Sequence, residues 1–130
     1  MSRTLWRLKV RGEFASAHAL RHYQGKCESL HGHNYGVEMV VEGETLTTDT
    51  ELVVDFSVHK KELRAELALI DHVNLNEYAP FDSINPSSEN LARYLYRRMK
   101  DRLNAMPGRL YSMTVAEMAI QSATYMELDG

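Results

Sequence analysis

Hydrophobic and polar residues alternate in two stretches near the N-terminus. Trp6, Leu8 and Val10 alternate with charged residues, which predicts a half-buried strand that continues towards Phe14. Residues 34–42 alternate in the same way and predict a second strand. Glycines punctuate the segment between the two stretches, as is typical of a turn, so the two strands can pair antiparallel.

Apolar residues then recur at helical spacing in two further segments. The first helix is predicted to begin at Asp55 or Ser57 and to end near Asp71. The second is predicted to begin at Ser87 or Ser88, because either hydroxyl can cap the free amides at a helix start. Its apolar stripe consists of Leu91, Tyr94, Leu95 and Met99.

Two more strands are predicted at residues 110–117 and 122–128, after the helix-ending pair Pro107-Gly108. The order strand-strand-helix-helix-strand-strand predicts one α+β domain over residues 1–130. Both helices would pack on one face of an antiparallel sheet. Such a sheet keeps two open edges unless copies of the chain close them into an oligomeric barrel.

The composition narrows the class of protein without indicating its chemistry. The net charge is −3 and no basic block occurs, so neither nucleic acid nor an anionic membrane is expected as the main partner. No apolar run reaches membrane-spanning length, and the opening MSRTLWRLKV does not resemble a signal peptide. A single cysteine excludes an internal disulfide and fits a reducing compartment. We therefore expect a soluble cytoplasmic protein.

Three of the six histidines have positions that are typical of metal ligands. His31 and His33 in HGHNY lie one residue apart, so on a strand their imidazoles share a face. His18 ends the first predicted strand and faces them if the two strands pair. Zinc accepts three imidazoles and keeps a fourth position open in catalytic sites. The alternative is that each histidine makes only a local hydrogen bond, which we expect of His22 and His59.

Cys27 precedes this histidine pair in the segment GKCESL. It can be an inert, buried small residue, a fourth zinc ligand that closes the site, or a base or nucleophile beside the metal. The polar, glycine-flanked segment argues against simple core packing. Lys26 and a nearby cation would lower the pKa of the thiol.

Two acidic positions complete the candidate chemistry. Asp71 either ends a helix next to His72 or orients that histidine as a proton relay. Glu117 continues the alternation of Tyr111, Met113 and Val115. It is either a strand-end residue that turns into solvent or a buried carboxylate that awaits paired N–H donors, because unpaired burial of a charge is costly.

Six ordered motifs resemble those of the 6-pyruvoyl tetrahydropterin synthase family. They are FASAH, C-x-x-x-HGHNY, VVDF, DHVNLN, NPSSENLA and a glutamate late in the third strand, and together they span about residues 14–117. Bacterial members of this family include 6-carboxytetrahydropterin synthase, an enzyme of queuosine and 7-deazapurine biosynthesis. The chain departs from the family's usual NPTSE by having serine at position 87, which keeps the hydroxyl.

The resemblance implies a fold and a reaction. The fold would be the T-fold, or tunnelling fold, in which three subunits join their sheets into a barrel and two trimers stack into a homohexamer. The substrate would be 7,8-dihydroneopterin triphosphate, which the 6-carboxy-forming members convert with loss of acetaldehyde and triphosphate. The only cofactor implied is Zn²⁺.

The resemblance also implies roles for individual residues. Zinc would be bound by His18, His31 and His33, and its open position would take the side-chain hydroxyls of the substrate. Cys27 would be the proton-abstracting thiol.

The remaining implied roles concern proton relay and pterin binding. His72 with Asp71 would relay a proton, and Glu117 would anchor the 2-amino and ring N–H groups of the pterin. Ser87 and Ser88 would border the pterin. The sequence itself does not locate the triphosphate site: Lys26, Arg21 and Arg11 are candidates for it, and the alternative is that each is a solvated surface charge.

Glu28 leaves the product open. The chain contains both C-x-x-x-HGH and E-x-x-HGH, and family members with the second motif form 6-hydroxymethyl-7,8-dihydropterin. The alternative is that Glu28 is a solvent-exposed neighbour of Cys27 without a catalytic role. Two further hypotheses are that the enzyme forms a 6-pyruvoyl product, and that the protein binds zinc and a pterin without turnover.

Overall fold

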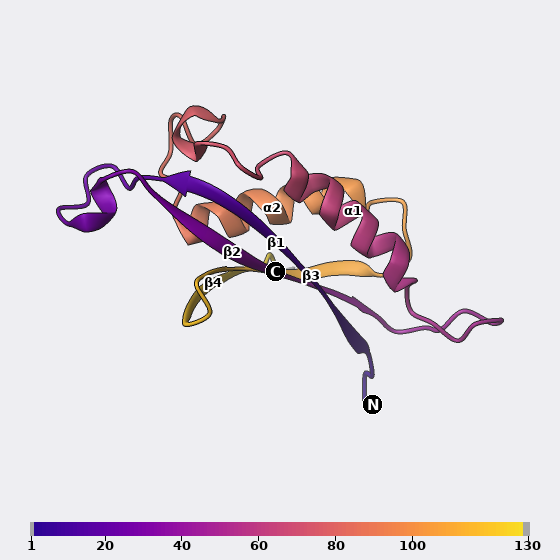
Figure 1. The fold of residues 1–130 in the computed structure, drawn as a ribbon. Helices are drawn as coiled ribbons and strands as arrows, with labels where there is room; N and C mark the ends of the chain where they lie inside the picture. The colour runs from indigo at the N-terminus through magenta and orange to yellow at the C-terminus, as the bar shows by residue number, and fades with distance from the viewer. Residues whose placement is uncertain (1, 129–130) are drawn as a thin grey trace.

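The computed structural model describes residues 2–128 as an antiparallel sheet with two helices on one of its faces (Figure 1). The strand order equals the chain order. The strands are β1 (Trp6–His18), β2 (His31–Gly43), β3 (Arg109–Glu117) and β4 (Gln121–Tyr125). Residues 1, 129 and 130 of the predicted domain lie outside the described part of the chain. The predicted α+β class and the position of the helices are confirmed.

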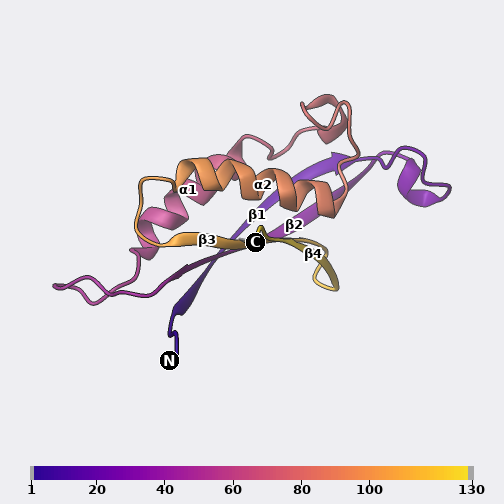
Figure 2. The same ribbon diagram turned by 180° about the vertical axis from the view of Figure 1, so that it is seen from behind.

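The helices α1 (Phe56–Ala68) and α2 (Ser88–Arg102) lie side by side over the sheet, as both views of the ribbon show (Figure 2). Two short 3₁₀ helices, η1 (Lys26–Glu28) and η2 (Leu75–Glu77), lie in the connections. Among residues 2–128, neither helix is long and apolar enough to cross a membrane. The helix-free face of the sheet borders a concave region with a volume of about 1110 Å³.

The pairing of β1 with β2 extends three residues beyond the predicted second strand. His31, Gly32 and His33 belong to β2, because they pair with the last residues of β1 and His31 lies directly opposite His18. β4 ends at Tyr125, short of the predicted residue 128.

The alternation along β3 is broken at Tyr111. A register shift between Val40 and Val41 lets Ser112 pair with Val40 and Leu110 with Val41. Tyr111 therefore does not continue the buried row of Met113, and its ring packs under the guanidinium of Arg7 at 3.7 Å. A bulge of this kind cannot be read from a pattern of period two.

The helix starts follow the predicted caps. Asp55 caps α1 by accepting a hydrogen bond from the Ser57 amide, and Ser87 caps α2. α1 ends at Ala68, earlier than the predicted Asp71. The reason is that the Asp71 carboxylate accepts the amide of Ala15 in β1 at 2.8 Å, which draws the chain onto the strand edge.

The core lies between the sheet and the two helices. Aliphatic, aromatic and methionine side chains from every layer are fully buried there. They include Tyr35, Met39, Leu63, Ile70, Phe81, Leu91, Leu95, Met99 and Met113.

A buried ion pair joins the two helices. Glu66 of α1 is fully buried, and its carboxylate accepts the Nε–H of Arg102 at 2.7 Å and that of Arg98 at 3.0 Å. An Arg102→Met substitution is expected to lower the free energy of unfolding by about 2 kcal/mol, because a buried carboxylate loses a charged hydrogen bond. Urea denaturation measures this change. Arg97→Met, at an exposed position of the same helix, should cost under about 1 kcal/mol, and equal losses in the two variants would contradict the prediction.

Candidate active site

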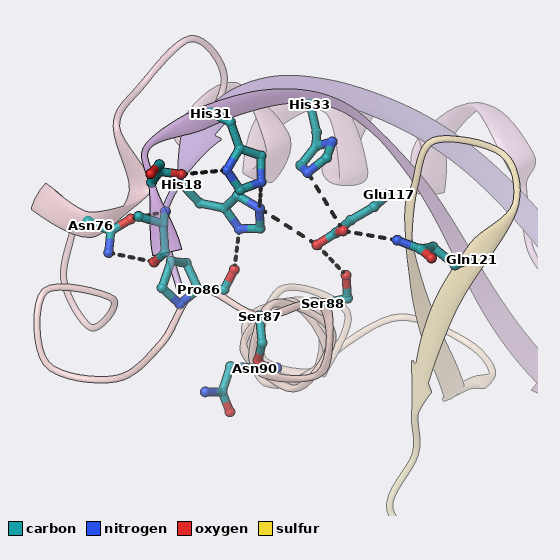
Figure 3. A network of polar contacts seen from close by, with 12 residues as sticks. His18, His31, His33, Asn76, Pro86, Ser87, Ser88, Asn90, Glu117 and Gln121 are labelled. Carbon is teal, nitrogen blue, oxygen red and sulfur yellow. Dashed lines mark hydrogen bonds and ion pairs between the residues drawn. The ribbon is translucent and has the colours of Figure 1, made fainter. Parts of the chain in front are cut away.

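Three imidazoles converge where the β1–β2 hairpin reaches the N-terminus of α2 (Figure 3). His18 and His31 are paired across the hairpin, and His33 lies two residues further on the same face. Their ligand nitrogens all lie within 4.8 Å of one another. His18 is buried, and the other two are partly exposed. The predicted cluster therefore forms within one chain.

Backbone carbonyls fix the protonation of two rings. Nδ1 of His18 lies 2.7 Å from the Pro86 carbonyl, and Nδ1 of His31 lies 2.7 Å from the Ser29 carbonyl. A carbonyl oxygen only accepts, so each Nδ1 carries the hydrogen and each Nε2 presents a lone pair. The two Nε2 atoms are 3.1 Å apart. Two lone pairs at this distance repel each other unless a cation or a shared proton lies between them.

These donors fit a zinc ion. Burial lowers the pKa of His18 and outweighs the opposite effect of its hydrogen bond to Pro86, which disfavours a shared proton. The Nε2 atom of His33 is buried and has no hydrogen-bond partner among the described residues. Tetrahedral zinc with nitrogen ligands at 2.0–2.1 Å separates those nitrogens by roughly 3.3 Å, close to the His18–His31 distance. Carbonyl partners on the second ring nitrogen are typical of metal-binding histidines.

Glu117 ends β3 beside this cluster, and its side chain is only 15% exposed. Its Oε1 accepts a hydrogen bond from the Ser88 hydroxyl at 3.1 Å and lies 3.7 Å from Nε2 of His18. Its Oε2 lies 3.7 Å from Nε2 of His33 and 3.4 Å from the side-chain nitrogen of Gln121. The carboxylate therefore points into the site, and the solvent-facing alternative is wrong.

The two serines of NPSSE have different surroundings. The Ser87 hydroxyl accepts the backbone N–H of Asn90 at 3.1 Å and is the cap of α2. Ser88, the first residue of the helix, donates its hydroxyl to Glu117. Only Ser88 therefore contacts the acidic group of the site.

Cys27 lies in η1 and is partly exposed as a free thiol. Its backbone carbonyl accepts the Leu20 amide at 2.8 Å. Among residues 2–128 the metal-type cluster comprises the three histidines without Cys27, so the geometry does not favour the cysteine as a fourth ligand. Glu28, the next residue, is exposed.

Asp71 and His72 form a pair, but on another side of the sheet. Nδ1 of His72 lies 2.9 Å from Asp71 Oδ2, and the imidazole is 79% exposed. The Ala15 amide and the His72 side chain lower the pKa of Asp71, so the carboxylate stays ionised and orients the ring. Asp71 borders the concave helix-free face, whereas the three imidazoles lie on the face that bears the helices. One chain does not bring this pair to the histidine cluster.

Two of the three candidate triphosphate contacts, Arg21 and Arg11, have partners within the chain. The Arg21 guanidinium donates to the backbone carbonyls of Phe81 at 2.8 Å and Ile84 at 3.1 Å. Arg11 is paired with Glu38. Lys26 is exposed in η1. Arg21 is thus a structural residue of the loop that precedes α2.

Two histidines outside the cluster were expected to make only local hydrogen bonds. His59 is buried in α1 and has such a contact, with Nδ1 3.3 Å from the Asp55 carbonyl, although its Nε2 is buried without a partner in the described chain. His22 is exposed. The sequence pattern did not single out Tyr35, whose buried hydroxyl has no hydrogen-bond partner in the described chain. Its ring lies edge-on to His18 and His33. Its place in HGHNY, two residues after His33, is the signal that indicates this position.

The profile of the family described as 6-pyruvoyl tetrahydropterin synthase matches residues 7–128. A 6-carboxy-5,6,7,8-tetrahydropterin synthase from Synechocystis sp. is 33% identical, over 93% of each chain. A dihydroneopterin monophosphate aldolase from Pyrococcus furiosus is 35% identical, over 75% of this chain and 77% of that protein. The structure of Caenorhabditis elegans 6-pyruvoyl tetrahydropterin synthase superposes with a TM-score of 0.84 at 29% identity, covering 98% of this chain and 100% of that one.

The fold is therefore the T-fold that the tetrahydropterin synthases share. The chain belongs to the 6-pyruvoyl tetrahydropterin synthase family.

Proposed function

We propose that the protein is a zinc-dependent lyase that converts 7,8-dihydroneopterin triphosphate to 6-carboxy-5,6,7,8-tetrahydropterin. Acetaldehyde and triphosphate leave, water is consumed, and the product serves queuosine or 7-deazapurine biosynthesis. The observation that carries the proposal is the convergence of three imidazole Nε2 atoms beside a buried carboxylate. The similarity to the Synechocystis 6-carboxy-5,6,7,8-tetrahydropterin synthase over nearly the whole chain supports the choice of product.

His18, His31 and His33 would hold the zinc ion. When bound, zinc supplies a Lewis acid that polarises the substrate's side-chain oxygens and acidifies the adjoining C–H and O–H groups. The protein's own contribution is orientation, because the carbonyls of Pro86 and Ser29 hold two of the rings with Nε2 towards the site.

Glu117 would hold the pterin. An ionised carboxylate accepts two parallel N–H bonds, and the 2-amino group and a ring N–H of a pterin present such a pair. The Ser88 hydroxyl donates a hydrogen bond to Oε1 of Glu117, and this bond fixes the direction of the carboxylate. The pterin would then lie against the start of α2, bordered by Ser87 and Ser88.

Cys27 would remove a proton from the substrate side chain, and His72, oriented by Asp71, would donate or relay one. Because the Asp71–His72 pair lies away from the histidine cluster of its own chain, this role requires a neighbouring subunit. We propose a cytoplasmic homohexamer of two stacked trimers. Unpaired sheet edges support it: in the described chain β4 pairs only with β3, and the Trp6 half of β1 only with β2.

Product analysis tests the proposal. Zinc-loaded protein incubated with 7,8-dihydroneopterin triphosphate is expected to give 6-carboxy-5,6,7,8-tetrahydropterin and acetaldehyde, identified by liquid chromatography with mass detection. Cys27→Ala should remove the activity. Intact substrate after incubation would refute the enzyme and favour a binding module, and a 6-pyruvoyl product would refute the carboxy-forming reaction.

A second candidate reaction is the folate-type cleavage to 6-hydroxymethyl-7,8-dihydropterin, with Glu28 as the base. Glu28 directly follows Cys27 in η1, and its side chain is exposed to solvent. The relative from Pyrococcus furiosus is a dihydroneopterin monophosphate aldolase. Glu28→Ala discriminates the two: loss of a hydroxymethyl product alone would assign that product to Glu28.

A further inference from the structure

Directly after β1, the backbone of residues 19–21 is hydrogen-bonded by the side chains of two asparagines, Asn76 and Asn85. Asn76 accepts the Ala19 amide at 2.8 Å and donates to the Ala19 carbonyl at 2.9 Å. Asn85 makes the same two contacts with Arg21, at 2.8 and 2.9 Å. A primary amide carries both a donor and an acceptor, so each asparagine reproduces what the peptide group of a neighbouring strand would offer.

The cysteine loop, residues 22–30, is bonded to this same short segment, residues 19–21. The Leu20 amide, between the two clamped residues, donates to the Cys27 carbonyl at 2.8 Å. Other backbone bonds of the loop, such as Glu28 N–H to Gly25, are internal to it. The loop is therefore attached to the segment that the two asparagines fix.

Asn85 is also tied to the histidine cluster. Asn85 precedes Pro86, whose carbonyl accepts Nδ1–H of His18. The Asn90 side chain in α2 donates to the Asn85 carbonyl at 2.8 Å. Asn85 and Pro86, neighbours in the loop before α2, thus contact both the segment to which the cysteine loop is bonded and a metal-facing ring.

We propose that Asn76 and Asn85 are positioning residues, which hold the Cys27 thiol at a fixed place relative to the three imidazoles without touching the substrate. The inference rests on the proposed role of Cys27 as the base. Proton abstraction depends steeply on placement, since a 1 Å displacement can cost on the order of 100-fold in rate. Only an amide fits, because a carboxylate would set a second oxygen against the carbonyl of Ala19 or Arg21.

The test uses the shape-conserving variants Asn76→Asp and Asn85→Asp in zinc-loaded full-length protein. Cys27 is the only cysteine, so alkylation by iodoacetamide, followed by intact mass, reports on this thiol alone. We expect alkylation at least about 5-fold faster in both variants, because the released loop opens more often. For turnover we expect kcat to fall on the order of 10- to 100-fold with KM changed less than about twofold. Asn104→Asp, at an exposed position after α2, is the matched control.

Alkylation at the wild-type rate in folded Asp variants would overturn the proposal. A raised KM with an unchanged kcat would overturn it as well. If neither variant folds, hydrogen exchange of the wild type decides: the Ala19, Leu20 and Arg21 amides must be protected at least about 100-fold, and free exchange refutes the clamp. Neither the alkylation rate nor the hydrogen exchange needs turnover. A wild type that forms no pterin product would therefore refute the proposed function separately from the positioning role.

Discussion

Replacing His33 with alanine is expected to remove bound zinc and to lower turnover on the order of 10³-fold or more. The Nε2 atom of His33 is buried without a hydrogen-bond partner in the described chain, so no hydrogen bond within the described chain competes with the ion for this atom. Loss of one of three protein ligands leaves the metal with two, fewer than catalytic zinc sites use. Zinc per chain, measured by plasma mass spectrometry after gel filtration, and product formation check both parts of the prediction.

Folding stability gives an independent readout of the same substitution. A ligand that binds only the folded state stabilises it by mass action, so chelation with EDTA should lower the Tm of the wild type. In His33→Ala the Tm should be insensitive to EDTA. His22→Ala, at an exposed position, is the control and should keep both zinc and the EDTA effect. Zinc at wild-type content in His33→Ala would show that the three imidazoles are not the metal site.

His33 is a better choice for this test than His18. His18 is 1% exposed and bonded to Pro86, so its removal leaves a cavity and an unpaired carbonyl, both of which destabilise the fold. The side chain of His33 is 14% exposed. His33→Ala is therefore expected to disturb the fold less than His18→Ala, and its Tm shows whether it is folded.

The histidine cluster was predictable because strand geometry determines it. An HxH pair on one strand and a histidine at the end of its antiparallel neighbour must meet on one face once the register is set. The caps at Asp55 and Ser87 were predictable for a similarly local reason, since a cap interacts within its own helix turn.

Features that depend on distant contacts escaped the sequence pattern. The face on which Asp71 and His72 lie follows from a bond to the Ala15 amide, 56 residues away along the chain. Asn76 and Asn85 also bind backbone that is remote in sequence, and a polar residue in a loop gives no local sign of such a partner. The displaced Tyr111 depends on the register of another strand.

Glu117→Gln is expected to lower kcat/KM on the order of 10²- to 10³-fold while zinc content stays at the wild-type level. The glutamine side chain has nearly the same shape, but one acceptor oxygen becomes an N–H₂ donor that opposes the pterin's own donors. A hydrogen bond to a charged group contributes about 1.5–3 kcal/mol, and a buried donor left without an acceptor costs about 1 kcal/mol more, so the loss of one such bond with two opposed donors corresponds to this range of rates. Steady-state kinetics with zinc analysis measures the effect, and Glu127→Gln, an exposed glutamate, is the control.

The combination of the two measurements separates the roles that the geometry allows Glu117. Its carboxylate lies 3.7 Å from a ring nitrogen of both His18 and His33, so a direct role in metal binding is the physical competitor of pterin anchoring. Zinc loss in Glu117→Gln would assign the residue to the metal. Full activity would refute both roles. Retained zinc with weakened catalysis, together with weaker binding of a pterin that lacks the triphosphate side chain, requires that the carboxylate acts on the pterin ring.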